Sequence, residues 1–266
     1  MIDSSQAVSD YFNEVSDRIT PAAEDQKIVA DRAAKITDEL TRDGRVEHVL
    51  VTGSTTKSTA IKDFSDIDIL VSLRPGPNAR RPEALDEVLR MAKSLSEYSS
   101  NVAISGNVVR IQFEDGPDVD VLVAFQSGTT SSGDQVYAIP SEDRRFWQPY
   151  APQQQSRKIQ EKISTLGKDF NSLIKVIKWW NCHHGRTMNS YRIETLACET
   201  FDTTMPEMPN ALVEFFDAAV NSGLESTGEE YSEVLESRAA AEAALDEVQQ
   251  GNLSKAMAYW GDLLGV

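Results

Sequence analysis

Two carboxylates, Asp66 and Asp68, stand two positions apart inside an apolar segment, and few folds tolerate such a pair. Residues two apart in a β-strand project from the same face, so Ile67 and Ile69 would project from the other face and be buried. Neighbouring carboxylates repel each other unless a cation lies between them, and a hard divalent ion is the natural partner. The segment therefore predicts a half-buried strand with a cation site on its other face.

A short, hydroxyl-rich turn precedes this strand. It has the sequence GSTTKSTA over residues 53–60. Gly53 and Ser54 can offer backbone N–H groups and a hydroxyl to phosphate oxygens, and a short helix over residues 54–61 would point its N-terminus at the same phosphates. A phosphate-binding turn beside paired carboxylates is typical of phosphoryl or nucleotidyl transfer.

A third carboxylate comes from residues 117–125, PDVDVLVAF, which also read as a strand. Asp118 and Asp120 would share one face, opposite the valines. Asp120 is favoured because it lies between two valines, whereas Asp118 follows Gly116-Pro117 and can belong to the turn. Three such carboxylates can hold two Mg²⁺ ions about 3.5–4 Å apart. The alternative is that Asp66 and Asp68 are edge-strand charges that oppose aggregation.

These motifs resemble the polymerase-β-type nucleotidyltransferase superfamily. The stretches LIKVIKWWNCHHG (173–185), NSYRIETLACETF (189–201) and GNLSKAMAYWGDLLG (251–265) are similar to the helical half of the cGAS/DncV-like nucleotidyltransferases, or CD-NTases. The resemblance covers residues 45–266. It implies an α+β fold: a nucleotidyltransferase lobe with a mixed sheet and helices, a helical C-terminal lobe, and an active site in the cleft.

The resemblance also implies roles for individual residues. The catalytic and metal-binding residues would be Asp66, Asp68 and Asp120. The substrate-binding residues would be Gly53, Ser54, Lys178 and Ser190 at the phosphates, with Tyr191 stacked on the base. The cofactor would be two Mg²⁺ ions, with Mn²⁺ as a substitute. Alternatives stay open: Lys178 as a solvated side chain, Ser190 as only a helix cap, and Tyr191 as a core residue.

The implied function is a Mg²⁺-dependent nucleotidyltransferase that joins nucleoside triphosphates into a cyclic or linear oligonucleotide second messenger, in bacterial antiphage signalling of the CBASS type. A regulatory or effector protein partner belongs to this expectation. The alternative is a nucleotidyltransferase that adds a nucleoside monophosphate to tRNA, another RNA or a protein. A catalytically idle nucleotide-binding module is a third class, and the intact set of three aspartates argues against it.

Composition limits the partners and the compartment. The net charge of −16 and the pI of about 4.6 argue against a broad nucleic-acid-binding surface. Cys182 and Cys198 fall in predicted helices, which favours free thiols over a disulfide framework. His183-His184 lacks a third metal ligand at a suitable spacing and reads as a polar helix end. No apolar run reaches the roughly 20 residues of a membrane span, and no signal peptide is evident, so cytoplasmic residence is expected.

The pattern predicts two domains: residues 1–140, a catalytic lobe with an N-terminal helix, and residues 141–266, a helical lobe. Thr20-Pro21 would begin a helix over 22–42. The other expected elements are strands over 46–51 and 66–73, a turn over 74–78, a helix over 82–98, strands over 101–114 and 117–125 joined at Asp115-Gly116, a mobile loop over 126–135, and helices from 142 onward.

Overall fold

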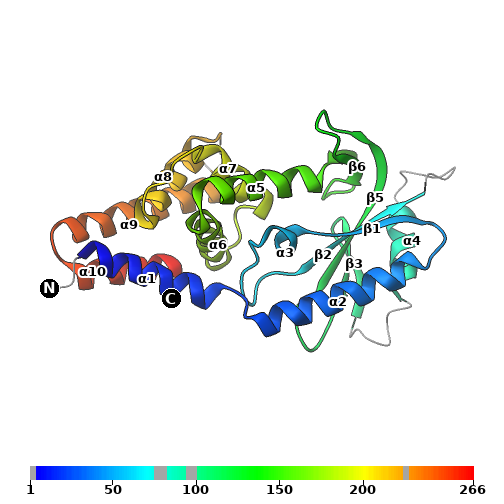
Figure 1. Cartoon of the computed structure of the whole chain (residues 1–266), viewed down its shortest axis with the longest axis horizontal. Coiled ribbons are helices and arrows are strands. Elements are labelled where there is room, and N and C mark those ends of the chain that lie inside the picture. The colour runs from blue at the N-terminus through cyan, green and yellow to red at the C-terminus, as the bar shows by residue number, and fades with distance from the viewer. Residues whose placement is uncertain (1–3, 75–82, 94–100, 224–227) are drawn as a thin grey trace. The chain divides into compact units, whose positions relative to one another are not determined.

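A mixed sheet and a group of helices form two separate units of the chain (Figure 1). The computed structural model describes residues 4–74, 83–93, 101–223 and 228–266. The sheet unit comprises Pro21–Arg157, and the helical unit comprises Met1–Thr20 together with Lys158–Val266. Each unit has its own hydrophobic core.

The chain alternates helices and strands in its first part and is helical thereafter. The strands are β1 (Val46–Thr52), β2 (Ile67–Leu73), β3 (Asn101–Ser105), β4 (Val108–Gln112), β5 (Val119–Thr129), β6 (Gln135–Pro140) and β7 (Trp147–Tyr150). The helices are α1 (Ser4–Ile19), α2 (Ala23–Thr41), α3 (Gly53–Lys57), α4 (Glu83–Ala92), α5 (Pro152–Leu166), α6 (Lys168–His183), α7 (Ser190–Thr200), α8 (Met208–Asn221), α9 (Glu229–Gln249) and α10 (Leu253–Leu264).

The sheet has the strand order β1-β2-β5-β4-β3, and β6 and β7 extend it from the far part of β5. The central strands β2 and β5 run parallel, while the other neighbouring strands are antiparallel. Central parallel strands are usually covered on both faces and are therefore rich in apolar residues. Accordingly, Ile67, Ile69 and Val71 are fully buried, as the sequence predicts.

Helices α2 and α4 cover one face of this sheet (Figure 1). They contribute the buried residues Ala33, Ile36, Leu40, Leu85, Val88 and Met91 to a core shared with the strands. The opposite face carries a smaller cluster formed by Leu70, Ala124, Tyr137 and Ile139. Asp68 projects from this second face, because it alternates with Ile67 and Ile69 along β2.

One arginine of α2 holds the turn between β4 and β5. Arg32 donates from Nη1 to the carbonyl of Pro117 at 2.8 Å and from Nη2 to Oδ1 of Asp115 at 2.7 Å. Its guanidinium also lies 4.0 Å from the centroid of the Phe113 ring, a cation–π geometry. These contacts fix the path of the turn and help to set the register in which β4 and β5 pair.

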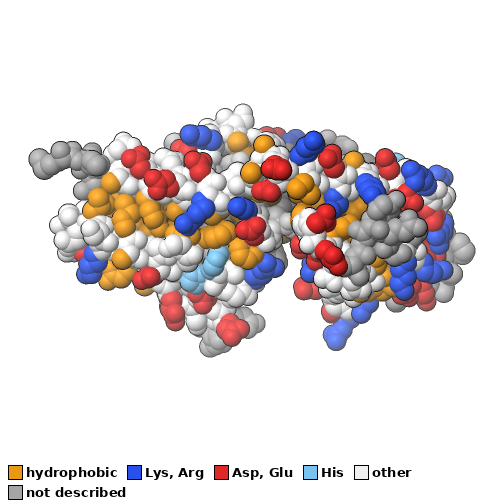
Figure 2. Space-filling view, turned by 90° about the horizontal axis from the view of Figure 1, so that it is seen from below, with side chains coloured by type: hydrophobic (Ala, Val, Ile, Leu, Met, Phe, Trp, Pro, Cys, Tyr) orange, Lys and Arg blue, Asp and Glu red, His pale blue; other side chains and the backbone are white. Residues whose placement is uncertain are grey.

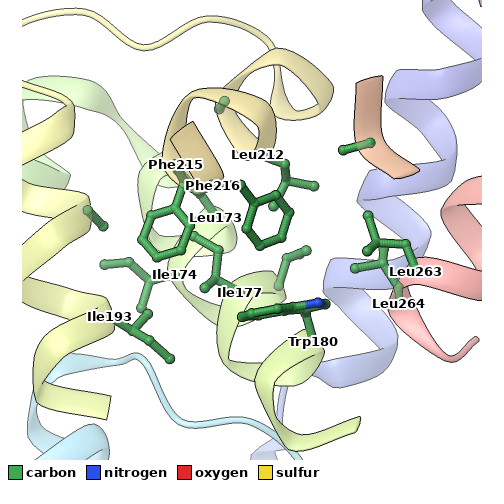
Figure 3. Packing of buried hydrophobic residues seen from close by; sticks show 14 of the residues in the cluster. Leu173, Ile174, Ile177, Trp180, Ile193, Leu212, Phe215, Phe216, Leu263 and Leu264 are labelled. Atoms are coloured by element: carbon green, nitrogen blue, oxygen red, sulfur yellow. The ribbon is translucent and has the colours of Figure 1, made fainter. Parts of the chain in front are cut away.

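The helical unit is organised around α6. Its buried Trp180 packs edge-on against Phe216 of α8 and donates from Nε1 to Oγ of Ser237 at 2.8 Å. Helix α1 joins the same core, where Phe12 packs against Trp260 of α10 with ring centroids 5.1 Å apart. Figure 3 shows how the apolar side chains of several helices surround Trp180.

Several expected strand boundaries are wrong. The segment 101–114 is two strands, because Gly106 with a φ of 54° permits a tight turn between β3 and β4. The expected mobile loop over 126–135 is partly sheet: β5 continues to Thr129, and its exposed polar end pairs with β6 across a turn over 130–134. Strand β7 lies in the region expected to be helical almost throughout from residue 142 onward. Polar, exposed strand ends lack the apolar alternation on which the prediction depends.

The start of the second helix also differs from the prediction. Thr20 donates from Oγ1 to the carbonyl of Ser16 at 2.7 Å at the end of α1, and the N-cap of the next helix is Ala22 instead. Helix α2 begins at Ala23, and Asp25 accepts from the backbone N–H of Ala22 at 3.1 Å. Helix α1 itself was not expected.

The two units do not coincide with the predicted domains of residues 1–140 and 141–266. Helix α1 packs with α6 and α8 in the helical unit, and the boundary between the units runs through α5 rather than near residue 140. The sheet unit extends further because β6 and β7 belong to its sheet. The predicted turn over 74–78 and the end of the helix predicted over 82–98 lie mostly outside the described residues.

Candidate active site

Strand register brings the predicted carboxylates together. Asp68 of β2 and Asp120 of β5 are Cα partners in adjacent parallel strands, so their side chains leave the sheet next to each other on one face. Asp66 lies just before β2, where the backbone N–H of Ile67 donates to the carbonyl of Asp118 at 2.9 Å. The strands are therefore paired up to the point where the three carboxylates lie.

An arginine that sequence reasoning missed lies within this cluster. Arg110 of β4 is the antiparallel Cα partner of Asp120. It donates from Nε to Oδ1 of Asp120 at 2.8 Å and from Nη2 to Oδ2 at 2.7 Å, and the same Nη2 lies 3.2 Å from Oδ2 of Asp66. The hydrogen bonds to Asp120, together with the surrounding negative charge, raise the pKa of Arg110. The sequence contains a signal for this pairing. A hairpin that turns at Asp115-Gly116 places residues at nearly equal distances from the turn opposite each other, and Arg110 and Asp120 are such a pair.

The turn before β2 packs directly against Asp68. Thr52 at the end of β1 is the Cα partner of Asp68, and the chain then enters the five-residue helix α3 at Gly53, with a φ of 71°. A Cβ added to Gly53 would lie only 1.7 Å from Oδ2 of Asp68. A side chain at position 53 and the observed position of Asp68 therefore exclude each other. The carbonyl of Ser54 accepts from the backbone N–H of Thr59 at 3.0 Å and closes the turn.

The alternative carboxylate, Asp118, takes a different place. It lies before β5, and its Oδ1 accepts from the backbone N–H of Phe113 at 3.3 Å, within the turn between β4 and β5. Asp120 instead lies on β5 and makes two hydrogen bonds to Arg110. The structure thus groups Asp120 with Asp66 and Asp68 and places Asp118 in the turn.

The donor chemistry of the cluster fits a hard divalent cation, since carboxylate oxygens are the ligands that Mg²⁺ prefers. Over the described ranges, however, no three Asp, Glu, His or Cys side chains already form a group that could hold a metal ion. Arg110 supplies positive charge to two of the carboxylates in this state. The carboxylates of Asp66, Asp68 and Asp120 are chemically suitable ligands for Mg²⁺, and in this structure Asp66 and Asp120 bind the guanidinium of Arg110.

Lys178, predicted to reach the phosphates, is buried in the core of the helical unit. Its Nζ lies 2.7 Å from Oε1 of Glu194, and the side chains are 5% and 0% exposed. It is therefore not the solvated side chain of the alternative reading. A buried pair of this kind is costly to break from one side, because the remaining charge loses its compensation. A role at the phosphates stays a prediction for Lys178.

Replacing Lys178 by methionine is expected to destabilise the protein by about 3–5 kcal/mol, since the buried Glu194 would lose its lysine partner. The double variant Lys178→Met/Glu194→Gln should recover most of this loss. Chemical denaturation measures both effects. The nucleotide KM of the double variant then separates the two roles: an unchanged KM assigns Lys178 to structure alone, and a large increase supports phosphate binding.

The structure excludes two alternatives at the start of α7, namely Ser190 as the helix cap and Tyr191 as a core residue. The N-cap is Asn189, whose Oδ1 accepts from the backbone N–H of Arg192 at 2.8 Å, whereas Ser190 is the first helical residue and is exposed. Ser190 is therefore not the cap. Tyr191 is 58% exposed and so is not a core residue. Their predicted roles at the phosphates and the base remain predictions, and both side chains are accessible to a ligand.

Tyr191→Ala is expected to raise the nucleotide KM about tenfold while changing stability by less than about 0.5 kcal/mol, because an exposed ring that stacks on a base contributes to binding rather than to the core. Phe146, which is also 58% exposed, offers a matched control as Phe146→Ala. Steady-state kinetics and thermal unfolding test the prediction. A marked loss of stability with an unchanged KM would contradict it.

The remaining predicted features lie in the helical unit. Cys182 and Cys198 are free thiols, and burial raises the pKa of Cys198 to about 11. His183 ends α6 with its ring against Trp179, and His184 contacts Glu233 and the carbonyl of Leu263, so neither belongs to a metal cluster of the described residues. Within the described ranges, no helix has both the length and the apolar character needed to cross a membrane.

Solved structures share this fold at low sequence identity. The sequence of E. coli MS115-1 CdnC, solved with ATP, is 17% identical to that of this chain. The two structures superpose with a TM-score of 0.77, and the match covers 97% of this chain and 96% of that chain. The E. coli MS115-1 CdnC:HORMA-deltaN complex is 18% identical, with a TM-score of 0.75 over 99% and 97% of the two chains. The Bradyrhizobium diazoefficiens CD-NTase CdnG with GTP is 12% identical, with a TM-score of 0.71 over 93% and 97%.

These likenesses confirm the predicted fold, in which a mixed sheet with helices is followed by a helical C-terminal region. The comparison with curated proteins found no match. The family described as the Second Messenger Oligonucleotide or Dinucleotide Synthetase domain, SMODS, matches residues 7–162, which is more than half of the chain. The chain therefore belongs to the SMODS family of synthetases.

Proposed function

We propose that this chain is a divalent-metal-dependent nucleotidyltransferase that joins nucleoside triphosphates into a cyclic or linear oligonucleotide second messenger. The proposal rests chiefly on one observation: Asp68 and Asp120 lie side by side on β2 and β5, with Asp68 against the Gly53 turn. The turn that begins at Gly53 can bind the phosphates of a nucleotide, and the carboxylates beside it can bind the divalent cations that accompany those phosphates.

Each predicted site residue in the sheet unit has a role in this proposal. Asp66, Asp68 and Asp120 would hold two Mg²⁺ ions, or Mn²⁺ in their place, and such ions neutralise phosphate charge when bound. Backbone N–H groups at Gly53 and Ser54 would orient the triphosphate. The acceptor hydroxyl attacks the α-phosphorus, its proton passes to the Asp120 carboxylate, and the bond to pyrophosphate breaks. Positioning and charge stabilisation supply most of the rate.

The proposed substrates are nucleoside triphosphates. Structures of this fold have been solved with ATP, for CdnC, and with GTP, for CdnG. Lys178, Ser190 and Tyr191 keep their predicted roles at the phosphates and the base. CdnC has also been solved in complex with a HORMA protein, and we infer a regulatory protein partner of comparable kind for this chain, acting in antiphage signalling.

The charge distribution supports a nucleotide acceptor over an RNA acceptor. On the face drawn in Figure 2, acidic and basic side chains are interspersed within each unit, with no broad basic area. Together with the net charge of −16, this favours small anionic substrates over a long polyanion. Transfer of a nucleoside monophosphate to RNA or protein is the alternative.

Incubation of the purified chain with each labelled nucleoside triphosphate and Mg²⁺ or Mn²⁺, followed by phosphatase, tests the proposal. Phosphatase-resistant label that forms without an added acceptor, together with released pyrophosphate, is expected. Label that appears only when RNA or protein is added would contradict it in favour of the alternative. Label formed with an Asp66→Asn/Asp68→Asn variant would reject the assigned site.

A further inference from the structure

Arg110 occupies the position between two of the proposed metal ligands. Its Nη2 donates to Oδ2 of Asp120 at 2.7 Å and reaches Oδ2 of Asp66 at 3.2 Å, so a single nitrogen bridges both carboxylates. Its Nε donates to the other oxygen of Asp120 at 2.8 Å. Both oxygens of Asp120 are thereby engaged by one guanidinium.

Charge explains why the guanidinium lies there. Asp66, Asp68 and Asp120 place three negative charges near one point of the sheet, and like charges at such distances repel strongly unless a cation intervenes. Arg110 supplies positive charge to Asp66 and Asp120, and its planar fork matches a carboxylate better than a lysine ammonium would. The guanidinium thus offsets the repulsion between the carboxylates, as a divalent ion would do.

We propose that Arg110 is a built-in competitor of the divalent cation: the ion must displace its guanidinium from Asp66 and Asp120 in order to bind. This inference rests on the proposed function. A cation held by Asp66 and Asp120 would need carboxylate oxygens that Arg110 now engages, and its charge would be repelled by the guanidinium.

The consequence is a metal site that is weak until a nucleotide arrives. Free Mg²⁺ or Mn²⁺ must break the ion pair of Arg110 with Asp120, in which the two side chains are 36% and 15% exposed. A triphosphate supplies further negative charge for the ion and a new partner for the released guanidinium. Arg110 would thus couple the loading of metal to the loading of nucleotide.

The test is Mn²⁺ binding to the full chain without nucleotide, followed by electron paramagnetic resonance of the free ion. Arg110→Gln is expected to bind Mn²⁺ about tenfold more tightly than the parent chain, since one competing charge is removed. Arg110→Lys keeps the charge but loses the fork, so its affinity should lie between the two. Arg145→Gln is the matched control, because it removes the same charge from a side chain that is 84% exposed and paired with Asp143.

The outcomes separate this inference from the proposed function. If the parent chain and Arg110→Gln bind Mn²⁺ equally, and binding depends on Asp68, then the competitor role is wrong while the metal site stands. Weaker binding by Arg110→Gln would instead show that the guanidinium assists the ion, and it too would overturn the inference. If no Mn²⁺ binds to either chain, with or without ATP, both the metal site and the competitor role fail.

A second readout guards against a purely structural role for Arg110. Without metal, Arg110→Gln is expected to unfold at a lower temperature than the parent chain, because its carboxylates repel each other unscreened. Saturating Mn²⁺ should then raise the unfolding temperature of Arg110→Gln more than that of the parent. An equal rise in the two chains would argue that Arg110 only stabilises the sheet and does not compete with the ion.

Discussion

Asp120→Asn is expected to lower the rate of nucleotide joining by at least about a hundredfold, whereas Asp118→Asn should stay within about threefold of the parent chain. Both substitutions remove one negative charge and keep the shape of the side chain. They differ in position, because Asp120 is the Cα partner of Asp68 while Asp118 lies in the turn. Only the first should remove a proposed metal ligand and proton acceptor.

Asp66→Asn and Asp68→Asn should cause losses as large as that of Asp120→Asn, with the fold intact. Labelled nucleotide incorporation measures the rates, and thermal unfolding checks the fold of each variant. If Asp118→Asn lost activity while Asp120→Asn kept it, then Asp118 rather than Asp120 would be the third catalytic carboxylate. Full activity in Asp66→Asn or Asp68→Asn would reject the assignment of the carboxylates altogether.

Gly53→Ala is the second change for which a large effect is expected. The left-handed backbone at position 53, with a φ of 71°, costs an L-residue about 1–2 kcal/mol. The added Cβ would also lie 1.7 Å from Oδ2 of Asp68 and 2.5 Å from its Cγ, so the carboxylate must move. The rate should fall by at least about a hundredfold, because a displacement of about 1 Å at a reacting group is enough for such a loss.

Gly44→Ala supplies the matched control, since a Cβ added there meets no atom within 4 Å. Its effect on stability should remain within about 0.5 kcal/mol and its rate should equal that of the parent chain. A Gly53→Ala variant that folds and keeps the full rate would contradict the placement of Asp68 against this turn. Thermal unfolding of both variants shows whether the lost rate reflects the site or the fold.

The features read correctly from sequence are those with a local cause. Alternation of Ile67 and Ile69 with Asp66 and Asp68 predicted both a strand and its buried face, and the structure confirms them. Helices α6 and α9 follow likewise from apolar residues at helical spacing. Helix α1 carries the same signal, because Val8, Phe12, Val15 and Ile19 recur at helical spacing and are buried, and it could have been predicted.

The features that were missed depend on register and tertiary context. Arg110 has no motif of its own, and only the pairing of β4 with β5 places its guanidinium on Asp120. The burial of Lys178 has no local signal, because only the fold brings Glu194, sixteen positions later, beside it in the core. Strand β7 has only four residues and none of them is buried, so its pairing with β6, rather than a buried face, makes it a strand.

A crystal grown with Mn²⁺ and a non-hydrolysable ATP analogue, measured for the anomalous scattering of manganese, tests the central assignment most directly. The expected result is manganese bound by Asp66, Asp68 and Asp120, with the triphosphate at the Gly53 turn. Manganese bound elsewhere, with these three carboxylates contacting neither ion nor nucleotide, would contradict it.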